Sequence, residues 1–274
     1  MSLDFAINHM TTPQLGLADF FALARDLGAP RVEIRNDISA NAILDGTPAT
    51  EVKRLATEND VTIVSVNALQ KFNQWSDTRL AEAEALADYA AACGARAVVL
   101  VAANDGAVQS PALRVENASG LLSEIAPILR KRQLFGLVEC LGFETCSLRS
   151  KKEAVAAIDR ANGRDIFRLT HDTFHHHLAG EPDLFPELTG LVHISGVDDP
   201  AVAVSDMRDS HRVLVGPGDR LDNIGQIAAL RAAGYSGPLS FEPFAEELRQ
   251  LADPAASVRQ SMNFIIDGLK AKAA

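Results

Sequence analysis

Four residues that can bind a metal ion lie within or at the end of separate apolar runs of the sequence. Three are carboxylates and one is an imidazole: Glu139, Asp172, His193 and Glu242. An unpaired charge in an apolar run carries a desolvation penalty of several kcal/mol. Three carboxylates that converge would also repel one another. One divalent cation would remove both problems if all four residues met at a single site.

Separate buried ion pairs are the alternative explanation for each of these residues taken alone. Lys and Arg are scarce near them, since Arg168 falls at the start of an apolar run and Arg212 falls in a loop. We therefore expect that a metal ion, and not the protein's own cations, neutralises the three acids.

Two further polar residues are candidates for substrate contact. His175 follows Asp172 by three residues, so one turn of a loop would bring both side chains to the same pocket. The adjacent His176 and His177 are expected to hydrogen-bond locally or to face solvent. Arg212 carries a fork of donors that suits the hydroxyl or carbonyl oxygens of a substrate, with a surface arginine as the alternative.

These candidates need a scaffold that brings distant segments together. The sequence contains eight short, β-rich apolar runs at intervals of roughly 30 residues, with helical patterns between them, which is typical of β/α units and a parallel sheet. We predict strands at 3–8, 31–35, 62–69, 97–103, 135–141, 167–173, 191–197 and 238–244.

Helical spacing of apolar residues fills most of the segments between these strands. We predict helices at 13–27, 50–58, 77–93, 112–131, 151–161 and 224–233, and only a short or irregular helix at 182–189. Four glycines that fall just after a helical pattern are expected to adopt a positive φ: Gly28, Gly94, Gly163 and Gly234. The loop 198–219, rich in Asp, Pro and Gly, is expected to border the active site.

The predicted fold is a single (β/α)₈ TIM barrel over residues 1–274. The length is close to the roughly 250 residues typical of this fold, and eight strands exceed the five or six of an open doubly wound sheet. A barrel confines its active site to the carboxyl ends of the strands, where all four candidate ligands fall.

Composition excludes several other classes of protein. The formal charge of −10 disfavours a nucleic-acid partner, because phosphate binding needs clustered Lys and Arg. No apolar stretch approaches the roughly 18 to 20 residues of a membrane span, and the first residues lack the pattern of a signal peptide. We therefore expect a cytoplasmic protein that binds neither nucleic acid nor a membrane.

The residues named so far resemble those of the xylose-isomerase-like barrel superfamily of sugar isomerases and epimerases, and within it the inosose (2-keto-myo-inositol) isomerases. The resemblance covers nearly the whole chain. Its most specific stretches are 32–35, 67–69 with 72–73, 137–139, 172–175, 192–193, 212–213 with 216–218, and 240–242.

The resemblance implies a divalent-metal-dependent isomerase or epimerase of a small, neutral polyhydroxy ketone, either an inosose-type cyclitol ketone or a ketose. Mn²⁺ is the expected ion, and Mg²⁺, Co²⁺ and Zn²⁺ are compatible with the ligands. Besides binding metal, Glu139 and Glu242 would act as paired catalytic acid and base through an enediolate. His175, Arg212 and Asn67 would contact the substrate.

Other functions remain open at this stage. The same site could serve a dehydratase or lyase of a keto-sugar or keto-glycoside. Endonucleases that act at abasic sites have the same barrel, but the resemblance to them implies a three-metal site with additional histidines at the ends of earlier strands. This sequence has no such histidines at the ends of its third and fourth predicted strands, near Asn67 and Ala103. A noncatalytic sugar-binding barrel is a further alternative. A homo-oligomer is possible, and the loop aromatics Phe72 and Trp75 could cap the pocket or meet a second subunit.

Overall fold

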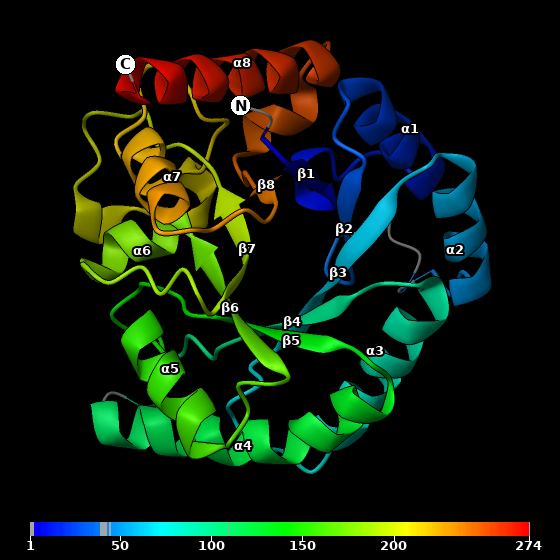
Figure 1. Cartoon of the computed structure of the whole chain (residues 1–274), viewed down its shortest axis with the longest axis vertical. Coiled ribbons are helices and arrows are strands. Elements are labelled where there is room, and N and C mark those ends of the chain that lie inside the picture. Colours follow the sequence, from blue (N-terminus) through cyan, green and yellow to red (C-terminus); the bar gives the residue numbers. More distant parts are fainter. Residues whose placement is uncertain (1–2, 39–42, 44, 109, 274) are drawn as a thin grey trace.

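Eight parallel strands close into a barrel in the computed structural model (Figure 1). The structure describes residues 3–38, 43, 45–108 and 110–273. Its strands are β1 (Phe5–Asn8), β2 (Arg31–Arg35), β3 (Thr62–Gln70), β4 (Ala97–Val101), β5 (Phe135–Glu139), β6 (Phe167–Asp172), β7 (Thr189–Ile194) and β8 (Leu239–Phe241). The predicted (β/α)₈ fold is confirmed, and the strand bounds differ from those predicted by a few residues.

The helices form an outer ring around the strands (Figure 1). They are α1 (Leu17–Leu27), α2 (Ala49–Glu58), α3 (Arg79–Cys93), α4 (Pro111–Lys131), α5 (Lys151–Arg160), α6 (Thr173–Ala179), α7 (Asn223–Ala232) and α8 (Pro254–Ala273). Short 3₁₀ turns occur at His9–Thr11, Val204–Asp206, Asp209–His211 and Glu246–Gln250. The helix α8, which contacts α1 and α7, has no counterpart among the predicted helices.

The helix after the sixth strand lies earlier in the chain than predicted. No helix forms at 182–189, and α6 begins at Thr173, directly after β6. The reason is a cap: Oδ1 of Asp172 accepts the backbone N–H groups of Phe174 and His175, at 2.7 and 3.2 Å. A side-chain acceptor at this position satisfies donors that the first turn of a helix leaves free.

Three of the four predicted positive-φ glycines are confirmed, and the fourth is wrong. Gly28, Gly94 and Gly234 have φ of 72°, 83° and 98°. After α5 the left-handed residue is Asn162, with φ of 50°, and not Gly163. The glycine is needed there for space, because a Cβ atom on Gly163 would lie 2.5 Å from the ring of Phe167.

The barrel interior changes from apolar to polar along the strands. Val99, Leu137 and Leu191 belong to a buried apolar cluster. Alternate residues of a strand face the same side of a sheet. Two residues beyond Leu137 and Leu191 therefore stand Glu139 and His193, on the same inner face. The strands thus place a polar layer at the carboxyl end of an apolar one.

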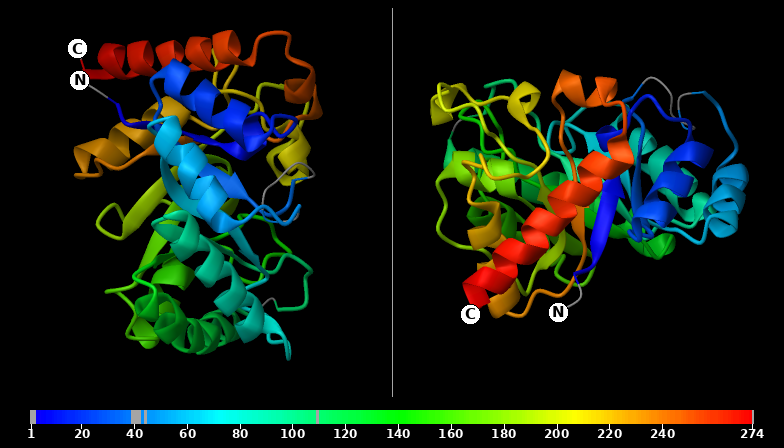
Figure 2. Two further views of the ribbon diagram at one scale, coloured as in Figure 1. Left: turned by 90° about the vertical axis from the view of Figure 1, so that its right-hand side faces the viewer. Right: turned by 90° about the horizontal axis from the view of Figure 1, so that it is seen from above.

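The long connection between β7 and α7 lies at the end of the barrel opposite to the chain termini (Figure 2). This is the end at which the strands finish, and it is where a barrel of this class carries its site. No helix in the described part of the chain is both long and apolar enough to cross a membrane.

Candidate metal centre

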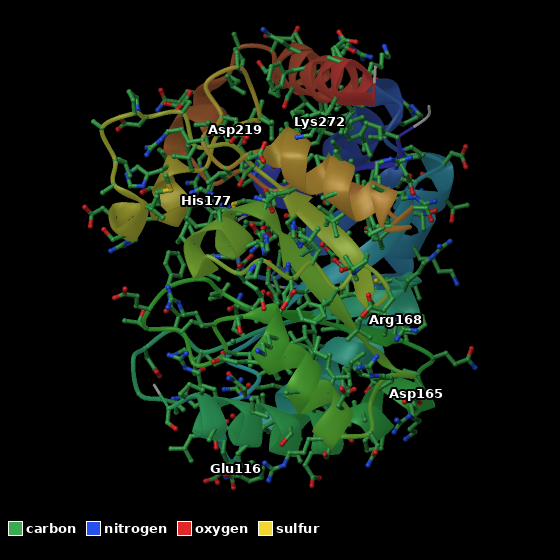
Figure 3. All side chains as sticks on the ribbon, turned by 60° about the vertical axis from the view of Figure 1, so that its left-hand side comes forward. Glu116, Asp165, Arg168, His177, Asp219 and Lys272 are labelled. Carbon is green, nitrogen blue, oxygen red and sulfur yellow. The ribbon has the colours of Figure 1, made fainter. Side chains whose placement is uncertain are left out.

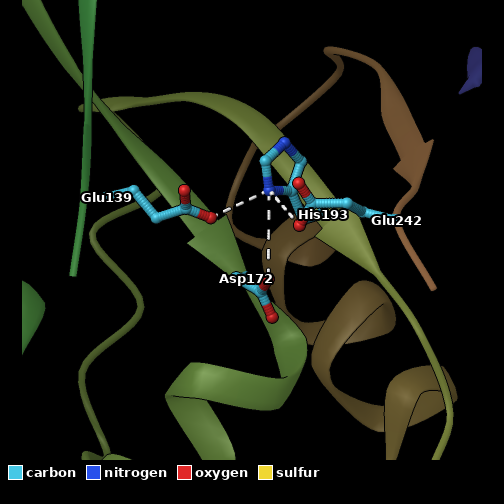
Figure 4. Close-up of side chains that lie close together, drawn as sticks. All are labelled: Glu139, Asp172, His193 and Glu242. Carbon is cyan, nitrogen blue, oxygen red and sulfur yellow. Dashed lines mark hydrogen bonds and ion pairs between the residues drawn. The ribbon is translucent and has the colours of Figure 1, made fainter. Parts of the chain in front are cut away.

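The four predicted metal ligands meet at the carboxyl ends of the last four strands (Figure 4). Glu139 and Asp172 are the final residues of β5 and β6, His193 is the penultimate residue of β7, and Glu242 follows β8 directly. One ligand atom from each residue lies within 4.8 Å of the others. All four side chains are buried.

His193 is the centre of the group. Its Nδ1 lies 2.9 Å from Oε1 of Glu139, 3.1 Å from Oε2 of Glu242 and 3.9 Å from Oδ2 of Asp172. Glu139 and Glu242 lie on either side of the imidazole (Figure 4). The Nδ1 atom therefore faces the three carboxylates together.

The two oxygens of Asp172 have separate tasks. Oδ1 caps α6, as described above, and Oδ2 accepts a 2.7 Å hydrogen bond from Nη2 of Arg212. Because the cap fixes the orientation of the carboxylate, Oδ2 is the oxygen that faces the centre.

The expectation that protein cations stay away from these acids is wrong. Arg212 is buried, and its Nη2 also lies 3.1 Å from Oε2 of Glu242. Arg35 donates from Nη1 to Oε1 of Glu242 at 2.7 Å. Neither pair has a local signal in the sequence, because Arg35 and Glu242 lie 207 residues apart and Arg212 comes from the long loop after β7.

The pKa values of the two glutamates are shifted in opposite directions. Burial raises the pKa of Glu139 above its ordinary value, even though His193 attracts its charged form. Burial alone would raise the pKa of Glu242 too. The attraction of His193, Arg212 and Arg35 for its charged form outweighs burial and holds the pKa well below the ordinary value. Burial opposes the charged form of His193 too, but the surrounding carboxylates, with Glu242 first, raise its pKa well above normal.

A fourth buried carboxyl residue, Glu33 on β2, was not predicted to have a role. Its oxygens lie 3.1 and 3.3 Å from Nε2 of His193, on the ring edge away from the other acids. Asn67, predicted to bind substrate, donates to Glu33 at 2.7 Å. The available signal was the alternation of the charged residues Arg31, Glu33 and Arg35 with Val32 and Ile34, which places Glu33 and Arg35 on one face of the strand.

His175 lies in the first turn of α6, and not in a loop, and its side chain is buried. Its ring packs edge-on against Phe143 and Phe174, with centroids 5.2 and 5.1 Å away. Nδ1 of His175 has no hydrogen-bond partner within the described part of the chain. Nδ1 of His176 lies 2.9 Å from the amine of Lys151, which precedes it by 25 residues, so its partner is not the local one that was predicted.

Three residues named in the sequence analysis lie outside the centre: Arg168, Phe72 and Trp75. Arg168, at the start of β6, lies at the opposite end of the barrel from His177 and Asp219 (Figure 3), so it does not reach the acids. Phe72 is fully buried in the core, which corrects the expectation that it is an exposed loop aromatic. Trp75 is 63% exposed, as that expectation required.

The donor set fits a divalent cation. Three carboxylates and one imidazole nitrogen suit Mn²⁺, Mg²⁺ or Zn²⁺. When ionised, the buried carboxylates number four with Glu33, and the guanidinium groups of Arg35 and Arg212 carry two positive charges. With neutral His193, two negative charges remain, which one divalent ion would balance. Such an ion would take the place of the proton on Nδ1.

The fold and this cluster together define a TIM barrel with a carboxylate and histidine centre at its strand ends. The family model described as "xylose isomerase-like TIM barrel" matches residues 21–267 of the sequence. The chain belongs to this family.

Three solved structures illustrate the relationship. A xylose isomerase domain-containing protein of Salmonella typhimurium LT2 is 32% identical, with 98% of this chain and 99% of that chain covered and a TM-score of 0.88. An IOLI protein with a bound zinc atom is 20% identical, with coverage of 98% and 99% and a TM-score of 0.87. The 3-keto-D-glucoside 4-epimerase YcjR of E. coli is 18% identical, with coverage of 97% and 100% and a TM-score of 0.74.

The similarity to the IOLI protein and to YcjR establishes a shared fold. No curated protein matches the sequence.

Proposed function

We propose that the protein is a divalent-metal-dependent isomerase or epimerase of a small, neutral polyhydroxy ketone, such as an inosose-type cyclitol ketone or a ketose. The observation that carries this proposal is the convergence of Glu139, Asp172 and Glu242 on Nδ1 of His193. In this arrangement the two glutamates would serve as proton carriers on either side of the proposed metal ion. Membership of a family of sugar isomerases and epimerases supports the same reaction class.

Glu139, Asp172, His193 and Glu242 would hold the ion, which we propose to be Mn²⁺, with Mg²⁺, Co²⁺ and Zn²⁺ as alternatives. When bound, the ion supplies Lewis-acid polarisation of a carbonyl group. The zinc atom in the IOLI structure supports the capacity of this fold to bind a divalent metal.

The two glutamates carry the proton. One carboxylate removes the proton from the carbon beside the ketone, and the substrate becomes an enediolate. The other glutamate, protonated at the start, returns a proton to the neighbouring carbon, which gives isomerisation once the hydroxyl proton has passed between the two adjacent oxygens, or to the opposite face of the same carbon, which gives epimerisation. The substrate loses one proton on carbon and gains one, and the two glutamates return to their starting protonation states by proton exchange with solvent. Positioned acids and bases of this kind contribute roughly 10² to 10⁴ in rate.

Arg212 and His175 would stabilise the developing negative charge on the substrate oxygen. Nε of Arg212 donates to Oγ of Ser195 at 3.0 Å, and its guanidinium lies over the rings of Phe174 and Phe244, at 5.1 and 4.6 Å. These contacts hold the donor in one orientation, which is the condition for electrostatic stabilisation of a transition state.

A neutral substrate fits the charges around the centre. Both guanidinium groups that reach the centre are already paired, Arg35 with Glu242 and Asp37, and Arg212 with Asp172, Glu242 and Asp209. A phosphate group would need cations that are free of such partners.

A second candidate is elimination from a keto-glycoside on the same residues, and one observation favours it. A cavity of about 480 Å³ is lined by Phe143, Leu178 and Asp209 among others, and two of these residues contact Arg212 and His175. Asp209 lies 3.2 Å from Nη1 of Arg212, and Phe143 packs on His175. A substrate with a second moiety beyond the reacting ring could use this space.

The test is proton NMR in D₂O of the manganese-reconstituted enzyme, after removal of the paramagnetic ion from quenched samples, with 2-keto-myo-inositol as substrate. We expect deuterium beside the carbonyl and the appearance of an isomeric inosose, with neither in a Glu242→Gln control. Exchange of a ketose alone would replace the substrate and keep the reaction. Release of an aglycone from a keto-glycoside would establish elimination. No exchange of any of these ketones with any divalent metal would refute catalysis by this site.

A further inference from the structure

We propose that Glu33 is a positioning residue that directs His193 toward the metal. Its carboxylate would hold the Nε2–H group of the imidazole, so that the lone pair of Nδ1 faces the three acidic ligands. This inference deepens the proposed function and rests on it, because it requires that the centre binds a metal ion.

Glu33 belongs to the polar layer of the barrel interior and lies at the Nε2 edge of His193. It lies on β2 with no exposed surface. The strand register places Asn8 and Ser65 beside it, and places Ser240 beside His193. The closed barrel therefore brings these side chains together on one level from strands that are far apart in the sequence.

Five side-chain groups from four neighbouring strands surround the Glu33 carboxylate. Oε1 accepts from Nδ2 of Asn8 at 3.3 Å and from the hydroxyl of Ser240, and Oε2 accepts from the hydroxyl of Ser65 and from Nδ2 of Asn67 at 2.7 Å. Nε2 of His193 lies 3.1 and 3.3 Å from the two oxygens. An ionised carboxylate offers about four lone-pair directions, so its capacity to accept is fully used.

This saturation separates Glu33 from the metal ligands. The other acids lie at Nδ1 of the ring, whereas Glu33 lies at Nε2. Two nitrogens of one imidazole point in different directions, so Glu33 cannot share an ion with Glu139. Its oxygens are occupied by donors that cannot leave a buried site without losing their partner.

The consequence for His193 is a single tautomer and a single orientation when metal is bound. An imidazole that donates from Nε2 to a fixed carboxylate presents Nδ1 as the ligand. The negative partner also makes the imidazole a better electron donor to the metal. Removal of such a partner from other metal sites lowers metal affinity by roughly 10- to 100-fold.

The first experiment is isothermal titration of Mn²⁺ into the full-length metal-free Glu33→Gln variant and wild type. We expect binding that is roughly 10- to 100-fold weaker in the variant, with an unchanged circular dichroism spectrum. The matched control is Ser65→Ala, which removes one hydrogen bond to the same carboxylate but leaves its contact with His193. We expect this control to bind Mn²⁺ within about threefold of wild type.

The second experiment reads the tautomer of His193 in the wild-type protein, so it tests the proposal even if Glu33→Gln does not fold. Proton–nitrogen NMR correlation of the zinc-loaded protein should show His193 protonated at Nε2 and metal-bound at Nδ1, with the N–H resonance far downfield. The resonance can be assigned by its absence in His193→Asn. In Glu33→Gln it should move upfield.

Two results would overturn the role of Glu33 alone: metal bound at Nε2 of His193, or a folded Glu33→Gln protein with wild-type affinity for Mn²⁺. Failure of wild type to bind either Mn²⁺ or Zn²⁺ would overturn the proposed function as well.

Discussion

The centre lies between two unlike walls of the barrel. On the wall made by β8, β1 and β2, Glu242 is held by Arg35 and Arg212, and Asn8 donates to its Oε1 at 3.2 Å. On the wall made by β5, the only ion pair of Glu139 within the described residues is with His193. Both glutamates are buried to the same degree, yet burial raises the pKa of one while nearby cations lower that of the other.

The difference shows that the two glutamates are not interchangeable, although both follow an apolar strand. Burial alone favours the neutral form of a carboxyl group, and only adjacent positive charge reverses this preference. Environments that separate two pKa values are the usual basis for distinct acid and base tasks at one site.

The largest expected effects come from Gln in place of each glutamate. Both Glu139→Gln and Glu242→Gln should lower kcat by roughly 10³-fold, because each removes a proton carrier. Their effects on stability should differ. Glu242→Gln removes one charged partner from each of two buried guanidinium groups, which keep Asp37 and Asp172, and should cost about 2 to 3 kcal/mol, whereas Glu139→Gln should cost less than about 1 kcal/mol.

Urea unfolding of the metal-free variants measures this contrast. Equal losses of unfolding free energy in the two variants would show that the walls are energetically alike. Wild-type turnover by either variant would remove that glutamate from the catalytic pair.

A smaller effect is expected at Arg212, which contacts Asp172 and Glu242 but not Glu139. Arg212→Lys keeps the charge but replaces a fixed fork of donors with one flexible ammonium. We expect kcat/KM to fall about 100-fold, in line with roughly 3 kcal/mol for one well-placed donor. Steady-state kinetics give this value. Arg168→Lys, at the far end of the barrel, is the matched control and should retain wild-type kinetics.

The smallest effect concerns the pH dependence of stability and again involves the wall made by β8, β1 and β2. Burial, with a contribution from Arg35, lowers the pKa of His9 to about 4, although a hydrogen bond to the carbonyl of Leu15 opposes the shift. Because the folded state binds this proton less tightly than the unfolded state, stability is full above the ordinary pKa of 6.5 and is lost as the pH falls toward 4.

For His9 this linkage amounts to a loss of about 2 kcal/mol between pH 7 and pH 5. His9→Gln removes the titrating group, so its unfolding free energy in urea should fall by about 2 kcal/mol less than that of wild type over the same interval. Identical pH dependence in the two proteins would mean that His9 accepts a proton in the folded state.

Much of the site could be predicted because its signals are local. Glu139, Asp172 and Glu242 stand out as charges at the ends of apolar runs, and a barrel brings strand ends together by construction. The helix α8 was missed although its apolar positions are no less regular than those of α3 and α7, because it follows the last strand and lies in no segment between two predicted strands. The position of α6 depended on a cap by Asp172, a residue already assigned to another task.

The sequence by itself determined the number of β/α units, the barrel and the four residues that converge at its mouth, since strand periodicity and strand ends are properties of short segments. Only the tertiary structure decided which groups surround them. Arg35 reaches Glu242 across the closure of β1 on β8, and Glu33 meets His193 across 160 residues of chain. Such pairs depend on strand register and barrel closure, and for that reason the pKa contrast between the two glutamates cannot be derived from the order of residues alone.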